Sequence, residues 1–307
     1  MKFCTGYVAL VGEPNVGKST LLNALLGQKL SIVTPKPQTT RHKIAGILTK
    51  ENLQIVFLDT PGLIKPKYAL QEVMMSSAEE AMTDADIVVF VVDASDREAA
   101  GVLEKSAFIS REREKRKSKQ RDEVERPIFL VLNKIDLVKK HEMLPLIQSA
   151  SEIFSFNEIV PLSAQTGENL DDFEKTLLKY LPEGNAFYPE DYVSDRDERF
   201  FVSELVREEI FNTFKEEVPY STTVEIEEFR DADDVRKTYI RAAIYVEKES
   251  QKGIIIGKGG AALKQIGQSS RKQIEEMVGH EVFLELFVKV RDGWRNNKNS
   301  LAQLGYR

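Results

Sequence analysis

The stretch "LVGEPNVGKSTLLNALLG", residues 10–27, constrains the fold more than any other part of the chain. Gly12, four intervening residues and the run Gly17-Lys18-Ser19 have the spacing of a phosphate-binding loop. The apolar run "YVALV" before it is typical of a buried strand, and the leucine-rich run after it is typical of a helix. The sequence therefore predicts a strand, a loop that wraps phosphates and a helix, which is the context that this motif requires.

Each residue type in this loop has a chemical reason. Glycines let backbone amides turn inward and approach a phosphate closely, and the helix that follows directs its free N–H groups to the same place. Lys18 would place a positive charge on the terminal phosphates, and the hydroxyl of Ser19 would be a ligand of Mg²⁺. The predicted nucleotide contacts of the loop are Gly12, Glu13, Pro14, Asn15, Val16, Gly17, Lys18, Ser19 and Thr20.

Composition narrows the class of protein. A chain of 307 residues that is 42% hydrophobic can bury a full core and is long enough for two domains. Cys4 is the single cysteine, which excludes an internal disulfide and a cysteine-based zinc site and fits a reducing cytosol. Because no run approaches the roughly 20 apolar residues of a membrane span, we expect a cytoplasmic protein whose membrane contact, if any, is peripheral.

Apolar runs alternate with helical patterns through the first 181 residues. The runs "QIVFLD", "IVVFVVDA", "IFLVLNK" and "IVPLSA" follow the first strand. Because strands that are apolar throughout belong to sheets covered on both faces, we predict an α/β domain at residues 1–181, with a mainly parallel sheet. The prolines and the glycine of "PEGNAFYPEDY" break any helix, so residues 182–198 are predicted to be a linker and residues 199–307 a second domain.

Three more motifs follow strands of this predicted sheet, at the ends where ligands of open α/β sheets bind. In "DTPG" the carboxylate of Asp59 can hold Mg²⁺ through water, and the amide of Gly62 can meet the terminal phosphate. In "NKID" the carboxylate of Asp136 can accept two hydrogen bonds from guanine, whereas adenine would leave it partly unpaired. The residues assigned to the nucleotide are Asp59, Thr60, Pro61, Gly62, Asn133, Lys134, Asp136, Ser163 and Ala164.

The remaining members of this set have supporting roles. Asn133 would brace the base and the loop, and the aliphatic stem of Lys134 would cover one face of the ring. Ser163 and Ala164 end the last strand, where the amide of Ala164 could meet O6 of guanine. Each motif alone is weak, but in this order and downstream of the phosphate loop they indicate a site for GTP and GDP.

Through these motifs residues 7–181 resemble the translation-factor-like class of GTPases. The resemblance implies that the segment "PKPQTTRHKIAG" holds a threonine whose hydroxyl completes the Mg²⁺ shell when the γ-phosphate is present; Thr40 fits best and Thr39 is the alternative. The metal ligands would then be Ser19, Thr40 and Asp59. We expect His42 to be a surface loop residue and not a ligand.

One position departs from Ras-like enzymes. Leu63 follows "DTPG", where a glutamine would orient the attacking water, so the water must be positioned in another way. Asn15 matches an asparagine that in some relatives helps to hold K⁺ against the phosphates, and such an ion could replace an arginine finger. The residues expected to act in hydrolysis are Lys18, Asn15, Thr40 and Gly62.

The second domain carries "GKGG", residues 257–260, between two helical patterns. This is the Gly-x-x-Gly loop of a KH domain, which clamps about four nucleotides of a single strand. The predicted order around it, helix, two strands, helix, loop, helix and strand, resembles the KH variant common in bacteria, so the domain is α+β. The predicted RNA contacts are Ile256, Gly257, Lys258, Gly259, Gly260, Lys264 and Arg271.

Charge supports this assignment. The whole chain has a net charge of −6, but residues 252–307 hold 10 Lys/Arg against 5 Asp/Glu, behind an acidic segment, residues 183–251, with 9 against 19. A local basic patch is what an RNA surface needs, because phosphate contacts supply much of the affinity. The mixed-charge stretch 110–126 is predicted to be a solvated helix or loop, with a nucleic-acid or partner contact as the alternative.

A GTPase domain joined to a KH domain, with "VKVRDGWRNN" and "LAQLGY" at the end, resembles the Era family of bacterial GTPases over nearly the entire chain. The resemblance implies binding of GTP, GDP and Mg²⁺, and binding of 16S ribosomal RNA near its 3′ end during 30S subunit assembly and rRNA maturation. It also implies a cytoplasmic monomer with a peripheral pool at the inner membrane. A pure RNA-binding module and a tRNA-modifying or membrane-tethering GTPase are the rival interpretations; the complete motif set opposes the first, and the second lacks its catalytic cysteine or anchor.

Overall fold

The computed structural model describes residues 2–96, 98–118, 125–232 and 237–306. The chain packs into two compact units. The first unit comprises Met1–Ser31, Lys43–Ile64 and Ser77–Asp195, and the second comprises Ile32–His42, Lys65–Ser76 and Arg196–Arg307. Two stretches that connect elements of the first unit therefore group with the second, and we call them the first loop segment (residues 32–42) and the second loop segment (residues 65–76).

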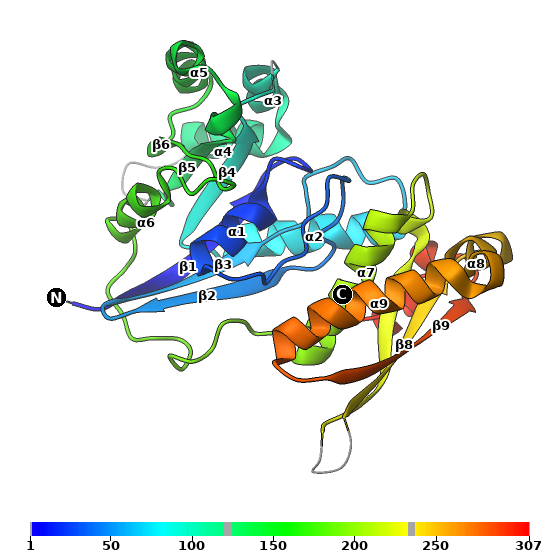
Figure 1. Ribbon diagram of the computed structural model, residues 1–307. Helices are drawn as coiled ribbons and strands as arrows, with labels where there is room; N and C mark the ends of the chain where they lie inside the picture. The colour runs from blue at the N-terminus through cyan, green and yellow to red at the C-terminus, as the bar shows by residue number, and fades with distance from the viewer. Residues whose placement is uncertain (1, 97, 119–124, 233–236, 307) are drawn as a thin grey trace. The chain divides into compact units, whose positions relative to one another are not determined.

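The first unit is built on a six-stranded sheet in the order β2-β3-β1-β4-β5-β6 (Figure 1). Among the strand pairs of this sheet that the structure describes, only β2–β3 is antiparallel, so the predicted mainly parallel α/β sheet is confirmed. The strands are β1 (Cys4–Val11), β2 (Ile44–Lys50), β3 (Leu53–Asp59), β4 (Ile87–Asp93), β5 (Ile128–Asn133) and β6 (Glu158–Pro161). The helices are α1 (Lys18–Leu26), α2 (Ala69–Asp84), which begins in the second loop segment, α3 (Ala99–Lys105), α4 (Ala107–Ser118), α5 (Lys140–Ile153) and α6 (Leu170–Leu178).

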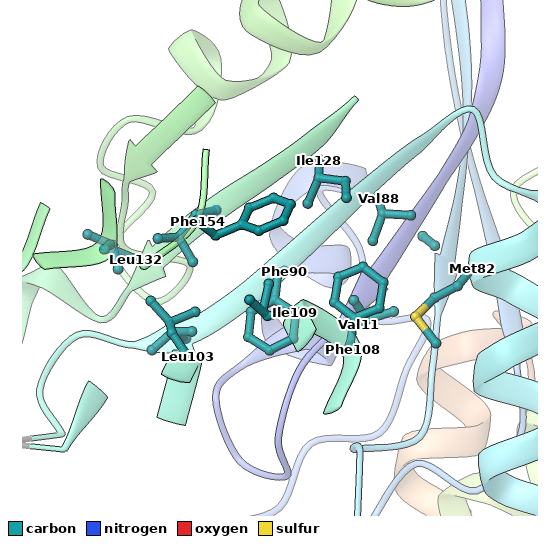
Figure 2. Packing of buried hydrophobic residues seen from close by; sticks show 14 of the residues in the cluster. Val11, Met82, Val88, Phe90, Leu103, Phe108, Ile109, Ile128, Leu132 and Phe154 are labelled. Carbon is teal, nitrogen blue, oxygen red and sulfur yellow. The ribbon is translucent and has the colours of Figure 1, made fainter. Parts of the chain in front are cut away.

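One face of this sheet carries an extensive apolar cluster. Alternate residues of β1, β4 and β5 pack there against α3, α4, α5 and the end of α2, as the side chains in Figure 2 show. The rings of Phe90 on β4 and Phe108 on α4 stack with their centroids 5.7 Å apart. Because successive side chains of a strand point to opposite faces, strands buried on both sides read as continuous apolar runs, as the sequence does here.

The other face of the sheet is covered by α1 near its β2 edge. A Cβ on Gly46 of β2 would lie 2.6 Å from Leu22 of α1, whereas its neighbours Ala45 and Ile47 share an apolar cluster with Ala81 of α2. The strand was not among those predicted, because it follows a polar segment and has a glycine in its interior, which weakens a strand signal. Here the glycine is required by the close approach of α1.

The charged stretch 110–126 is helical up to Ser118, whereas Glu125 and Arg126 lie outside any helix. Helix α4 ends at Ser118, and residues 119–124 lie outside the described residues. Two of its arginines are not simply solvated: Arg113 donates to the carbonyl of Ile153, and the guanidinium of Arg116 lies 4.5 Å from the centre of the Phe154 ring. These contacts give part of the charge run a packing role within the first unit.

The second unit contains the predicted order of elements. They are α7 (Glu198–Thr213), β7 (Thr223–Arg230), β8 (Thr238–Val246), α8 (Glu249–Ile256), α9 (Ala261–Val278), β9 (Val282–Val290) and α10 (Lys298–Gln303). The three strands form a sheet in the order β7-β8-β9, with β8 antiparallel to β7 and parallel to β9. Side chains of α7, α8 and α9 pack on one face of it, so this α+β unit has its own core.

Candidate functional site

The phosphate loop joins β1 to α1, and Ser19 and Thr20 lie in the first turn of that helix. Two of its glycines have no room for a side chain. A Cβ on Gly12 would lie 2.2 Å from the carbonyl oxygen of Val91, and one on Gly17 would lie 2.2 Å from Nδ2 of Asn133; both residues also have positive φ. The loop therefore needs glycine at these positions for packing before any ligand is considered.

Lys18 and Asp59 form the charged centre of this loop. Burial lowers the pKa of Lys18 to about 8, and its ammonium group donates to the carbonyls of Gly12 (3.1 Å) and Glu13 (2.9 Å). Burial likewise raises the pKa of Asp59, whose Oδ2 accepts a hydrogen bond of 2.7 Å from the hydroxyl of Ser19. Among the described residues, Oδ1 of Asp59 has no hydrogen-bond partner. A buried lysine and a buried, half-satisfied carboxylate suit a polyphosphate and a divalent cation, which would supply the missing counter-charges.

The "DTPG" motif lies against the phosphate loop. A Cβ on Gly62 would be 2.7 Å from the backbone nitrogen of Pro14, so the two backbones are in direct contact. The next residue, Leu63, donates its amide to the carbonyl of Gly12 at 2.9 Å and packs against the apolar cluster on β1, β4 and β5. Thr60 is buried and its hydroxyl donates to the carbonyl of Leu10. Leu63 thus fixes the loop and brings no polar group to the site.

The "NKID" motif is tied to the same loop. Asn133 donates to the carbonyl of Val16 at 2.8 Å, and Lys134 donates to the carbonyl of Asn15 at 2.9 Å. Asp93, at the end of β4, accepts a second bond of 2.6 Å from Lys134. Burial raises the pKa of Asp93, but hydrogen bonds from Lys134 and Ser95 outweigh it and the pKa lies below its usual value. Sequence reasoning missed Asp93, although an aspartate at the end of an apolar strand is the same signal that marked Asp59.

The other base-reading residues form a hydrogen-bonded set. The hydroxyl of Ser163 donates to Asp136 at 2.5 Å, and the amide of Ala164 donates to Oδ1 of Asn133 at 3.0 Å. Asp136 itself is exposed, as a carboxylate that accepts from a ligand must be. The amide of Ala164, which was expected to meet O6 of guanine, thus donates to Asn133. This hydrogen bond joins the strand end at Ser163 and Ala164 to the "NKID" motif.

The first loop segment holds both candidate threonines. Thr39 and Thr40 are buried, and the hydroxyl of Thr39 donates to the carbonyl of Lys36 at 2.8 Å. The prediction for His42 was wrong: it is not a surface residue but is partly buried and stacks on Tyr306, with ring centroids 4.5 Å apart. Sequence reasoning failed there because the aromatic partner lies 264 positions further along the chain.

The "GKGG" loop of the second unit lies between α8 and α9. Gly257, Gly259 and Gly260 all have positive φ, and only Gly257 is crowded, since a Cβ there would lie 2.8 Å from that of Ala262. Lys258 and Gly259 are exposed, and Ile256 is partly buried. The loop therefore presents backbone and one lysine to solvent.

A groove of about 400 Å³ runs from this loop between α9 and β9. Gly260, Lys264 and Arg271, three of the predicted RNA contacts, line it. Phe283 also lines it, with 58% of its surface exposed, and stacks on Tyr239 of the neighbouring strand. Sequence reasoning missed Phe283; an aromatic residue at a strand position that alternates outward was the available signal.

Comparison with known proteins follows the division into two units. The family model described as "50S ribosome-binding GTPase" matches residues 7–134, and the model described as "KH domain" matches residues 217–295. A crystal structure of Era in complex with MgGDPNP and nucleotides 1506–1542 of 16S ribosomal RNA is 40% identical, with 99% of each chain covered and a TM-score of 0.88. The chain belongs to the Era family of GTPases.

A second solved structure supports the same family assignment. It is a point variant of Aquifex aeolicus Era bound to GDP·AlF4⁻, 40% identical, covering 100% of this chain and 99% of that one, with a TM-score of 0.88. The predicted GTPase and KH architecture and the Era resemblance are therefore confirmed. Across the described residues, no helix is long and apolar enough to cross a membrane.

Proposed function

We propose that this Era-family protein binds GTP with Mg²⁺, hydrolyses it to GDP, and uses its KH domain to bind 16S ribosomal RNA near the 3′ end during 30S subunit assembly and rRNA maturation. The observation that carries the proposal is the 40% identity, over 99% of both chains, to an Era that was crystallised with MgGDPNP and 16S rRNA nucleotides. The phosphate loop and the basic groove of the second unit support it from this chain's own residues.

Mg²⁺ would be held by Ser19, Asp59 and Thr40, with Thr39 as the alternative threonine. Oδ1 of Asp59, buried and without a hydrogen-bond partner among the described residues, is an oxygen available to the ion's water shell. When bound, Mg²⁺ neutralises charge on the β- and γ-phosphate oxygens. Lys18 would add its charge to the same phosphates, and the amide of Gly62 would bind the γ-phosphate.

Guanine would be selected by Asp136. Its carboxylate would accept from N1–H and the exocyclic amine, while the hydroxyl of Ser163 holds the carboxylate in place by donating to Oδ1 at 2.5 Å. Lys134, fixed at its ammonium end by Asp93 and the carbonyl of Asn15, would lay its aliphatic stem against the ring. Because both side chains are already held in place before the nucleotide binds, less conformational entropy is lost on binding.

Water attack needs a device other than the glutamine of Ras-like enzymes, because Leu63 occupies that position and faces the core. We propose that K⁺, held in part by Asn15, supplies positive charge next to the phosphates. Asn15 adopts a φ of 64° and its carbonyl accepts from Lys134, so its backbone is fixed in a conformation that non-glycine residues rarely adopt. A residue kept under such strain is a candidate for function.

RNA would follow the groove between α9 and β9. Phosphates would approach Gly259 and Gly260 with Lys258, Lys264 and Arg271 as counter-charges, and bases would meet the exposed ring of Phe283. Nε of the exposed Arg271 is also 3.9 Å from the partly buried Glu275, an ion pair of small energetic value that RNA phosphates could displace.

Two measurements test this function. GTP turnover is followed with Mg²⁺ present and with EDTA, and binding is titrated with an RNA of the 16S 3′-terminal sequence and with a scrambled RNA of equal length. We expect Mg²⁺-dependent turnover and at least about tenfold preference for the 16S RNA. Turnover that is indifferent to EDTA would overturn the nucleotide assignment, and equal binding of both RNAs would overturn the RNA assignment.

The ribosomal partner can be tested separately. Because the matching family model is described as 50S ribosome-binding, co-sedimentation is measured with purified 30S and 50S subunits. We expect the 30S subunit to retain the protein; retention by the 50S subunit alone would replace our proposal.

A monomeric state, a mostly cytoplasmic location and a peripheral inner-membrane pool are further parts of the proposal, supported by the family resemblance. Analytical ultracentrifugation should give the mass of one 34.9 kDa chain. Flotation with anionic vesicles should recover a salt-sensitive fraction. If the vesicles float without bound protein at low salt, the proposal of a membrane pool is wrong.

A further inference from the structure

Helix α7 holds the first loop segment, which contains both candidate threonines. Nη2 of Arg207 donates to the carbonyl of Thr39 at 2.6 Å, and Arg207 also pairs with Glu204 one turn earlier. Both side chains are buried. Burial opposes the charge on Glu204, but Arg207 outweighs it and holds the pKa of the carboxyl below its usual value. The carbonyl next to Thr40 is therefore bound to a fixed, charged donor on the RNA-binding domain.

Other contacts continue along the same helix. Glu208 accepts a hydrogen bond of 3.1 Å from the amide of Val33, and Lys36 donates to the carbonyls of Phe211 and Phe214 at the end of α7. The last carbonyls of a helix lack intrahelical partners and attract a cation. The segment thus follows α7 over much of the helix's length.

Arg41 joins the segment to the turn before β7. Its guanidinium is buried, and it donates to the carbonyls of Thr222 (2.7 Å), Pro219 (3.0 Å) and Tyr220 (3.1 Å). Burial lowers the pKa of Arg41. Three carbonyls in the turn before β7 match the fork of an arginine, which a lysine could not satisfy in the same geometry.

The stretch after β9 completes the contact. Tyr306 stacks on His42, and its hydroxyl shares a hydrogen bond of 2.9 Å with that of Thr223. Tyr306 also stacks on Trp294, which is fully buried. His42 is therefore held by a ring that is itself fixed to the sheet of the second unit.

The second loop segment packs on the same residues. One apolar cluster contains Leu70, Met74, Trp294, Leu301 and Tyr306. Gln71 donates to the side chain of Gln38 at 2.9 Å, which ties the second segment to the first. The first loop segment is thus packed against α7 and Tyr306, and the second against the stretch 294–306.

We propose that Arg41 and Tyr306 are positioning residues that transmit the nucleotide state to the RNA-binding domain. The inference rests on the proposed function, in which Thr40 is recruited by Mg²⁺ and the γ-phosphate. Thr40 lies between the bound carbonyl of Thr39 and the bound side chain of Arg41, so GTP cannot reposition it without moving or releasing groups of the second unit. Such a link makes RNA affinity depend on the nucleotide, and nucleotide affinity depend on RNA by the same factor.

The experiment measures coupling in the full chain. A labelled 16S 3′-terminal RNA is titrated against protein held with GDPNP or with GDP, and the ratio of the two dissociation constants is compared among variants. Arg41→Met removes the three hydrogen bonds, Arg41→Lys restores charge without the fork, and Tyr306→Leu removes the stack. Arg199→Met, an exposed arginine on α7 outside these contacts, is the matched control. Circular dichroism verifies folding, and Tyr306→Leu serves if Arg41→Met does not fold.

We expect a ratio of at least about fivefold in the parent and in Arg199→Met. It should fall to within about twofold of unity in Arg41→Met and Tyr306→Leu and lie between in Arg41→Lys, with GDP affinity unchanged in all of them. A variant ratio equal to that of the parent would overturn the inference and leave the proposed function standing. A parent ratio of unity would overturn both the switch and its transmission through these residues.

Discussion

The two glycine-containing loops of this protein use glycine for different physical reasons. In the phosphate loop, a Cβ on Gly12 or Gly17 would lie 2.2 Å from the atoms of neighbouring elements, so the protein itself excludes a side chain. In the "GKGG" loop, Gly259 and Gly260 have open space around them, and only their positive φ favours glycine. The first loop is fixed before its ligand arrives; the second leaves its space to the ligand.

Alanine substitutions test this contrast directly and should give the largest effect. Gly12→Ala must displace the Val91 backbone, so we expect loss of detectable GDP binding and a destabilisation of at least about 3 kcal/mol. Gly259→Ala meets no atoms and should cost only the left-handed backbone penalty of about 1–2 kcal/mol. Urea unfolding and GDP titration of the two variants measure both quantities. Equal losses of stability at Gly12 and Gly259 would contradict the proposed difference between the two loops.

Charge can be removed from the phosphate loop without altering its glycines. Lys18→Ala should weaken both GTP and GDP by at least about 100-fold, because it leaves the terminal phosphates without their buried cation. RNA binding by the GDP-free protein should not change. The exposed Lys175→Ala serves as control, and isothermal titration with each nucleotide is the measurement. Retained nucleotide affinity would contradict the assignment of Lys18.

Asp136 is expected to read the base, so its substitution should also change nucleotide affinity. Asp136→Asn replaces one of the two acceptor oxygens by an NH2 donor, so GTP should lose about 10- to 100-fold in affinity while XTP, whose carbonyl replaces the guanine amine, should gain. Competition between the two nucleotides gives the preference. A variant that keeps the parent's preference for GTP would show that another group reads the base.

In the open loop, charge is expected to matter more than volume. Changing Gly259 and Gly260 together to Asp should reduce RNA affinity by at least about 30-fold, since carboxylates would occupy the surface that phosphates approach. Changing both to Ala should reduce it only several-fold. Filter binding at fixed salt measures both, with GDP affinity as the reference that should not move. If the Ala pair is as damaging as the Asp pair, backbone conformation and not access controls binding.

The smallest expected effect concerns the cation. Replacing K⁺ by Na⁺ should slow GTP turnover several-fold in the parent but matter little in Asn15→Ala, whose rate should already be low. The reason is Leu63, which leaves the water without a polar partner at that position. Turnover of each protein is measured in both salts, and equal parent rates would make Asn15 a structural residue of the loop.

The sequence predicted the sheet and the nucleotide motifs because both depend on local spacing. Gly12, Lys18 and Asp59 are marked by their order after apolar strands, and the structure brings Lys18, Ser19 and Asp59 together in one unit. The strand β2 was missed, since a polar segment and an interior glycine conceal it. Prediction from the sequence succeeds where the spacing of neighbouring residues determines the local structure.

The errors came where distant parts of the chain meet. His42 was expected at the surface, but its environment is set by Tyr306, and the position of Lys134 is set by Asp93 on another strand. In the sequence, Phe283 is one of 16 phenylalanines; its position in the groove beside α9 is what makes it a candidate RNA contact. The sequence marks Asp93 and Phe283 only by their strand positions and His42 not at all, so their partners are revealed only by the folded chain.

The position of Trp294 has an optical consequence. It is the chain's single tryptophan, it is fully buried, and its indole nitrogen donates to the carbonyl of Ser221 at 3.0 Å. All tryptophan emission therefore originates in the RNA-binding unit, whereas the GTPase unit contributes none. Unfolding followed by tryptophan emission will report on one unit and unfolding followed by far-ultraviolet dichroism on both, so a label-free comparison of the two curves can tell whether the units lose structure together or in sequence.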